Sequence, residues 1–217
     1  MPVNIPAYTG IKTELEKKNI TLVAVSKTKP VEDILELYNL GHRDFGENYV
    51  QELVDKQSFL PKDINWHYIG HLQSNKVKSI APFVHLIHGV DSLKLLKEIN
   101  KEAGKNNRVI DVLLQVFIAQ EETKFGLDKE ELSTVINESA NLNYINIKGL
   151  MGMASFSDDL QKVRGEFRNL KTIFDKHTQL SILSMGMSGD YKIAIEEGST
   201  MIRIGSLLFG ERNYTVK

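Results

Sequence analysis

A lysine at the end of a predicted buried strand is the residue of this chain best placed to do chemistry. Leu22–Ser26 is a run of apolar and β-branched residues, Lys27 follows it directly, and Pro30 opens a predicted helix. An amine at the carboxyl end of a strand lies where α/β proteins keep their chemistry. The alternative is an ordinary solvated lysine, because lysine side chains are almost always exposed.

Two candidate phosphate-binding turns follow the last two predicted strands. Ser188 is predicted to be the N-cap of a helix ending near Gly198, and an inward-facing Arg203 precedes a Gly205-Ser206 turn. Free backbone N–H groups at such turns, together with serine hydroxyls, favour a dianionic phosphate. Each turn alone could be routine capping chemistry. Together they match the place where (β/α)₈ barrels hold phosphate.

The composition predicts a single domain spanning residues 1–217. With 41% hydrophobic residues, the chain can bury a substantial core, and its formal net charge of −1 gives no basic surface for nucleic acid. The absence of cysteine excludes disulfides and thiolate chemistry. The start of the chain lacks an apolar signal region, and no run approaches the length of a membrane span. We therefore expect a cytoplasmic protein with no membrane contact.

Strand and helix patterns alternate along the chain, which is typical of a parallel sheet covered by helices. Eight strands favour closure into a (β/α)₈ TIM barrel, an α/β fold, and Ile5–Asn19 would be an extra helix before the first strand. Asp91 is predicted to cap one helix, and Asp128 with Glu131 to form a capping box on another. The expected strands are Leu22–Ser26, Asp44–Gly46, Trp66–Gly70, Val84–Gly89, Val109–Phe117, Ile147–Met153, Ile182–Met187 and Thr200–Gly205.

The histidines do not predict a metal site. His85 and His88 are three residues apart on a strand, so they are expected on opposite faces. His67 and His71 flank the end of the third strand and are interpreted as structural. No metal ligand is predicted in this chain.

Two further features have both a chemical and a structural interpretation. Glu47 and Glu52 could form an acid–base pair, but a loop and a polar helix start are the preferred interpretation. Gly149, in a predicted strand, could admit a flat ring at the mouth of the barrel or relieve crowding inside it, and the sequence does not separate the two.

Six ordered motifs resemble those of the pyridoxal phosphate homeostasis protein family. The resemblance spans residues 22 to 212 and implies a barrel of the alanine racemase N-terminal-domain type that binds pyridoxal 5′-phosphate (PLP). It also implies that Asn48 lines the pocket. The motifs are AVSKTKP, FGENYVQE, WHYIGHLQSNK, GLMGMASF, LSMGMSGD and STMIRIGSLLFGER.

The same resemblance implies roles for five other residues. Lys27 would be the Schiff-base lysine, and Ser188, Gly205 and Ser206 would contact the phosphate. Arg203 would face the pyridine nitrogen of PLP. A guanidinium stays protonated and keeps that nitrogen unprotonated, which weakens the ring as an electron sink. Arg203 therefore argues against transamination.

We expect a PLP carrier that delivers its cofactor to apo-enzymes, not an enzyme. A racemase needs a positioned acid–base group on each face of the substrate. The resembling racemases take the second group, a tyrosine, from another domain. Neither Tyr49 nor Tyr68 is obviously placed to replace it. The alternatives are a minimal PLP-dependent amino-acid racemase and a cofactor-free Schiff-base aldolase acting on a phosphosugar. A monomer is expected. Lys29 and Lys124 are either transfer lysines for PLP or solvated loop residues.

Overall fold

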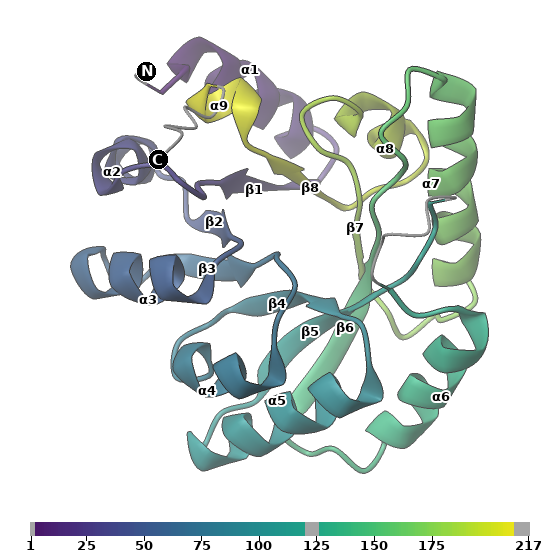
Figure 1. Cartoon of the computed structure of the whole chain (residues 1–217). Helices are drawn as coiled ribbons and strands as arrows, with labels where there is room; N and C mark the ends of the chain where they lie inside the picture. The colour runs from purple at the N-terminus through teal and green to yellow at the C-terminus, as the bar shows by residue number, and fades with distance from the viewer. Residues whose placement is uncertain (1–2, 120–125, 211–217) are drawn as a thin grey trace, which may run out of the picture.

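Eight parallel strands close into a barrel, with helices packed around the outside (Figure 1). The computed structural model describes residues 3–119 and 126–210. The strands are β1 Thr21–Val25, β2 Asp44–Glu47, β3 Asn65–Tyr68, β4 Leu86–Val90, β5 Ile110–Gln115, β6 Ile145–Met151, β7 Ile182–Ser184 and β8 Met201–Ile204. The helices are α1 Ile5–Glu16, α2 Val31–Asn39, α3 Val50–Phe59, η1 Ser74–Lys76, α4 Val77–Ile80, α5 Leu93–Lys105, α6 Lys129–Ser139, α7 Leu160–Phe174, α8 Tyr191–Glu196 and α9 Ser206–Phe209.

The predicted TIM barrel with an N-terminal helix is confirmed. The strands follow one another around the barrel in sequence order, and β1 pairs with β8 from Thr21↔Met201 to Ala24↔Ile204. The pairing between β7 and β8 is the shortest, with Ser184↔Met201 as its one registered pair. Beyond this pair, the N–H of Met185 donates a further hydrogen bond across the same junction, to the carbonyl of Met201 at 3.2 Å.

The core has two parts because side chains alternate along each strand. A large apolar layer fills the space between the strands and the helices, and it includes Leu22, Ala24 and Phe45. A smaller cluster fills the inside of the barrel: Val23, Leu86, Leu113, Met151 and Met201. The polar residues that share this interior are therefore held in a close-packed setting.

Several predicted ends of elements need correction. The first helix ends at Glu16, three residues before Asn19, whose φ of 54° is left-handed. β7 ends three residues before the predicted Met187, because Gly186 takes a φ of 96°. The capping box of Asp128 and Glu131 is confirmed.

The predicted cap at Asp91 is wrong. Ser92 is the N-cap of α5, and its hydroxyl accepts a hydrogen bond from the N–H of Leu95 at 3.3 Å. The carboxylate of Asp91 instead lies 3.1 Å from Nδ1 of His71.

Gly149 is explained by close packing between strands. A Cβ at this position would lie 1.7 Å from the carbonyl oxygen of Ile182 in β7. The structure therefore favours the interpretation in which Gly149 relieves crowding over the one in which it admits a flat ring.

No helix in the two described stretches, 3–119 and 126–210, is long and apolar enough to cross a membrane.

Candidate functional site

A cavity of about 720 Å³ opens at the carboxyl-terminal ends of the strands. This is the end of a barrel where the loops after the strands converge. The cavity brings together all six residues predicted to contact a cofactor, which come from the loops after β1, β2 and β7 and from β8 and the turn after it. They are Lys27, Asn48, Ser188, Arg203, Gly205 and Ser206.

Lys27 lies in a tight turn directly after β1 and is half-buried. The next residue, Thr28, has a φ of 63°, which is an unfavourable conformation for a β-branched residue. The N–H of Thr28 donates to Oε1 of Glu52 at 2.6 Å. That hydrogen bond holds the turn in the conformation that presents Lys27 to the cavity.

A buried ionic cluster supports the same turn from below. The ammonium of Lys56 donates to Oε1 of Glu47 at 2.8 Å, to Oε1 of Glu52 at 2.6 Å and to the carbonyl of Ser26 at 2.8 Å. The hydroxyl of Ser26 donates to Glu47 at 2.7 Å. Both neighbours of Lys27 in the sequence are thus tied to α3 and to the end of β2.

Glu47 is the least ordinary member of this cluster. It is the last residue of β2, not part of a loop as predicted, and it is fully buried. Burial raises the pKa of Glu47 to about 7, although the Lys56 ammonium and the Ser26 hydroxyl oppose the rise. Its Oε2 atom has no hydrogen-bond partner among the described residues. The sequence pattern favoured a loop and a polar helix start for this segment, and it therefore did not predict the ionic cluster.

The two candidate phosphate turns lie side by side. The hydroxyl of Ser188 accepts a hydrogen bond from the N–H of Gly205 at 3.3 Å, so it joins the turn after β7 to the turn after β8. Within the described chain, the N–H groups of Ser188, Gly189 and Ser206 make no hydrogen bond. Partnerless amides beside two serine hydroxyls suit an anion with several oxygens.

The prediction that Ser188 caps a helix is wrong. Residues 188–190 form a turn, and α8 begins after it with Asp190 as the preceding residue. The carboxylate of Asp190 accepts from the N–H of Met187 at 2.6 Å and closes that turn. The hydroxyl of Ser188 is left to contact Gly205.

Arg203 is buried in the barrel interior below the cavity. Its guanidinium donates to the carbonyl of Ser184 at 3.0 Å, to the hydroxyl of Ser184 at 2.7 Å and to the carbonyl of Gly152 at 3.3 Å. Burial lowers the pKa of Arg203 to about 10, with Asp190 opposing the fall. Arg203 is still a cation at neutral pH, as predicted.

A chain of hydrogen bonds runs from Arg203 through the barrel to its amino-terminal end. The Ser184 hydroxyl lies 3.2 Å from Nδ1 of His88, Nε2 of His88 lies 3.0 Å from Nδ1 of His67, and Nε2 of His67 lies 3.0 Å from Oδ1 of Asp44. Burial lowers the pKa of His88 well below its usual value, with smaller contributions from His67, Arg203 and His85, so this ring is neutral.

The groups at the two ends of this hydrogen-bonded series fix the direction of their own bonds. A carboxylate only accepts, so His67 donates from Nε2 to Asp44. Nδ1 of His67 and Nε2 of His88 share one hydrogen bond, and Nδ1 of His88 shares the next with the hydroxyl of Ser184. Ser184 in turn accepts from Arg203. The guanidinium therefore donates at one end of the series, and the carboxylate accepts at the other.

The predicted separation of His85 and His88 is wrong. The rings of both contact the ring of His67, with centroids 5.4 Å and 5.2 Å away. His85 precedes the first residue of β4, so the alternation of the strand does not yet apply to it. His71 lies outside the barrel interior beside Asp91, and His67 is buried.

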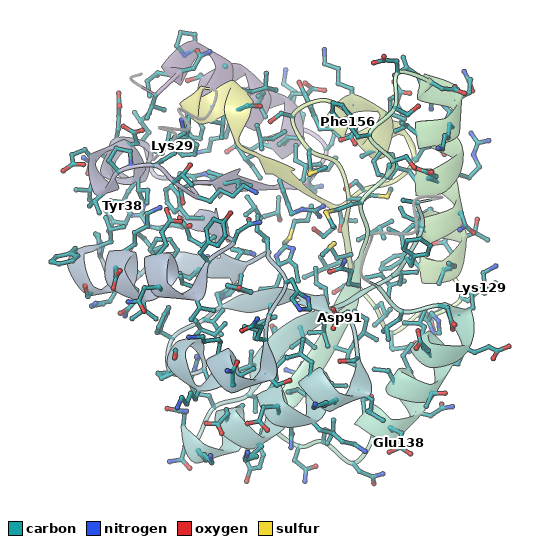
Figure 2. All side chains as sticks on the ribbon, in the orientation of Figure 1. Lys29, Tyr38, Asp91, Lys129, Glu138 and Phe156 are labelled. Carbon is teal, nitrogen blue, oxygen red and sulfur yellow. The ribbon has the colours of Figure 1, made fainter. Side chains whose placement is uncertain are left out.

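The remaining candidates have less connection with the cavity chemistry. Tyr68 is buried, its hydroxyl lies 2.9 Å from the carbonyl of Asn48, and burial raises the pKa of Tyr68 to about 12. Tyr49 is exposed. Lys29 lines the cavity, and its ammonium donates to the carbonyl of Phe209 at 2.6 Å, close to α9 (Figure 2). Lys124 lies outside the described residues.

The fold and the cavity define the class: a (β/α)₈-barrel protein whose pocket contains a lysine, a buried guanidinium and several N–H groups without a partner among the described residues. The family model of the alanine racemase N-terminal domain matches residues 8–213. The chain is 45% identical, over 89% of its length and 87% of the relative's, to the pyridoxal phosphate homeostasis protein of Aquifex aeolicus. The chain therefore belongs to the pyridoxal phosphate homeostasis protein family.

Solved structures agree with this assignment. PipY of Synechococcus elongatus, solved with PLP bound, is 34% identical with a TM-score of 0.87, and the match covers 94% of this chain and 99% of PipY. An alanine racemase of Clostridium difficile has a TM-score of 0.77 at 16% identity, covering 99% of this chain and 60% of the racemase. The second likeness is one of fold alone.

Proposed function

We propose that this protein binds pyridoxal 5′-phosphate in the cavity at the carboxyl-terminal end of the barrel. The observation that carries the proposal is the convergence of Lys27, the amide turns at Ser188 and Gly205, and Arg203 on one pocket. The amide oxygen of Asn48 is buried there without a partner among the described residues. The residues present therefore fit a ligand that has an aldehyde, a phosphate and a ring nitrogen.

Each part of the ligand has a matching group in the chain. The amine of Lys27 would hold the aldehyde carbon, and the turns at Ser188 and Gly205-Ser206 would hold the phosphate. Arg203 would donate to the ring nitrogen, and Asn48 would line the pocket. PLP supplies an aldehyde that a lysine can hold covalently and a ring that withdraws electrons. Names of relatives, including PipY solved with PLP, support this proposal.

We further propose that the protein carries PLP within the cell and delivers it to apo-enzymes. Arg203 stays charged at neutral pH, so it does not give up a proton to the ring nitrogen. The hydroxyl of Tyr68 contacts the carbonyls of Asn48 and His71, and its pKa is about 12. Tyr68 therefore does not serve as a base at neutral pH. The relatives are named for homeostasis, not for a reaction.

The experiment that tests the proposal is reduction with borohydride followed by peptide mapping. The purified full chain is mixed with PLP, and its visible absorbance is recorded before and after reduction. We expect the pyridoxyl group on Lys27, and loss of the visible band in Lys27→Ala. Lys129→Ala is the control, because Lys129 lies on α6 away from the cavity and should leave the band unchanged (Figure 2).

Three outcomes would redirect the proposal. A mapped adduct on another lysine would contradict the role of Lys27, and no visible band with any PLP concentration would favour the cofactor-free aldolase. Rapid exchange of the α-proton of alanine in deuterated water, lost in Lys27→Ala, would favour the minimal racemase. The match to the family model of the alanine racemase N-terminal domain is the observation that keeps this second function open.

Four features of the proposal rest on the sequence. They are the single-domain organisation of residues 1–217, the monomeric state, the cytoplasmic location, and transfer of PLP through Lys29 or Lys124. Slower transfer to an apo-enzyme in Lys29→Ala or Lys124→Ala, without much loss of binding, would support the last of these, and unchanged transfer in both would contradict it.

A further inference from the structure

Three side chains with metal-binding atoms meet at the amino-terminal mouth of the barrel, at the opposite end from the cavity. Asp44 begins β2, His67 lies in β3, and His85 directly precedes β4. These three strands are neighbours in the barrel. One ligand atom from each residue lies within 4.8 Å of the other two, and Nε2 of His67 is 3.0 Å from Oδ1 of Asp44.

The cluster is supported from inside and open to the outside. His67 is buried, Asp44 is half-buried and His85 is exposed, so an ion could enter from solvent. Nδ1 of His67 is held by His88 at 3.0 Å, and Oδ1 of Asp44 accepts from the side-chain amide of Asn65 at 3.2 Å. Metal-binding histidines almost always have the second ring nitrogen fixed by such a partner.

The neighbouring charges are of both signs. Partial desolvation of the His85 ring and the neighbouring His67 lower the pKa of His85 overall, while Asp44 and Asp111 raise it and Arg108 lowers it. The guanidinium of Arg108 is occupied by the carbonyls of Ala81 and Val84, at 2.6 Å and 2.8 Å.

We propose that Asp44, His67 and His85 bind one divalent cation of the Zn²⁺ class. Two imidazole nitrogens and one carboxylate oxygen suit Zn²⁺ or Co²⁺, whereas Mg²⁺ and Ca²⁺ prefer oxygen ligands throughout. Ligands at about 2.0–2.2 Å from one ion lie roughly 3.3 Å apart. His67 and Asp44 are near that spacing already, and the exposed side chain of His85 moves inward to complete the site.

Coordination would fix which ring nitrogens of the two histidines carry protons. His67 must offer a bare Nε2 to the ion, so its single proton lies on Nδ1 and is donated to Nε2 of His88. The single proton of His88 then lies on Nδ1 and is donated to the hydroxyl of Ser184. The proposed metal site is thus linked through two ring N–H groups to Ser184, the residue that contacts Arg203.

Calorimetric titration of the full chain with Zn²⁺ tests the proposal, with Co²⁺ visible absorbance as a second signal. We expect one ion per chain, at least tenfold weaker binding in His85→Ala, and no change in His177→Ala. His177 lies between α7 and β7, away from the cluster. His85→Gln repeats the test if circular dichroism shows that the alanine variant does not fold.

Each result decides for or against the site. Absence of binding, or equal binding in the wild type and in the folded His85 variants, overturns it. The titrations are run with and without added PLP, because PLP itself can bind metals. A stoichiometry that depends on PLP would assign the ion to the cavity and contradict the proposal, while PLP binding with no metal binding would leave the proposed function intact.

Discussion

Lys27 takes its position from the residues on either side of it. Ser26 and Thr28 are both hydrogen-bonded to the buried cluster of Glu47, Glu52 and Lys56. A left-handed conformation at a residue other than glycine costs about 1–2 kcal/mol, so Thr28 keeps its φ of 63° only while the rest of the cluster holds it. The backbone that carries Lys27 is thus already held in place before any ligand binds.

The raised pKa of Glu47 makes this cluster sensitive to pH. Its pKa is 4.5 in the unfolded chain and about 7 in the folded protein. The protonated form is thus favoured by folding, and the stability it contributes is fully present below pH 4.5 and lost as the pH rises through 7. The loss amounts to roughly 3 kcal/mol.

Glu47→Gln should remove this dependence, because glutamine stays neutral while keeping a similar shape. We expect the free energy of unfolding of the variant, relative to the wild type, to rise between pH 4.5 and pH 8 in urea titrations. Glu36→Gln, on the exposed side of α2, is the matched control and should follow the wild type. Parallel curves for the wild type and Glu47→Gln would show that the carboxyl group does not titrate in this range.

At the scale of the elements, the contact between the turns after β7 and β8 decides how the cavity meets an anion. The hydroxyl of Ser188 accepts from Gly205, so the two turns cannot separate without losing a hydrogen bond. The amides of Ser188, Gly189 and Ser206 are thereby kept close together. A phosphate could accept a hydrogen bond from each of these three N–H groups, which have no partner among the described residues.

Ser188→Ala should weaken the binding of PLP more than the binding of unphosphorylated pyridoxal. Loss of one hydrogen bond to a charged group costs about 1–3 kcal/mol, or roughly 5- to 150-fold in affinity. Fluorescence titration with both ligands measures the difference, and Ser133→Ala on the exposed face of α6 is the control. Equal weakening for both ligands would mean that the serine does not recognise phosphate.

The sequence predicted the elements better than the contacts between them. The apolar run before Lys27 was enough to place the lysine at a strand end, since strand patterning is local. The burial of Glu47 depends on Lys56 and Ser26, nine and twenty-one residues away. Charged residues are mostly exposed, so no local pattern indicates such a cluster.

The series of hydrogen bonds from Arg203 to Asp44 inside the barrel was not predicted, for a similar reason. Whether His67 and His88 meet depends on the register between β3 and β4, which the structure fixes at His67↔Leu86. A shift of one residue would turn either ring to the other side of the strand. The motif resemblance placed six residues around one cavity, but nothing in it indicated the chain beneath Arg203.

For the whole molecule, closure of the barrel depends on close contact between neighbouring strands. Gly149 in β6 lies so near β7 that a Cβ would meet the backbone of Ile182. Backbone cannot move aside as a flexible side chain can, so the strands would have to separate. The barrel would then lose pairing on one side of its shortest strand.

Gly149→Ala should lower the free energy of unfolding by at least about 3 kcal/mol, because the added methyl group overpacks the junction. Gly165→Ala, in the interior of α7 where a Cβ meets nothing within 4 Å, should raise it by about 1 kcal/mol. Urea unfolding of the two variants provides the comparison. Similar stability in both would show that the barrel adjusts at Gly149 without cost.

The junction between β7 and β8 has one registered pair, whereas every other junction of the barrel has two or more. A ligand that contacts both Ser188, after β7, and Gly205, after β8, would hold the two strands of this junction together. Any molecule bound only to the closed form makes opening rarer in proportion to its occupancy. Amide hydrogen exchange in β7 and β8 should therefore slow when ligand is bound, because opening of this junction would first require the ligand to leave.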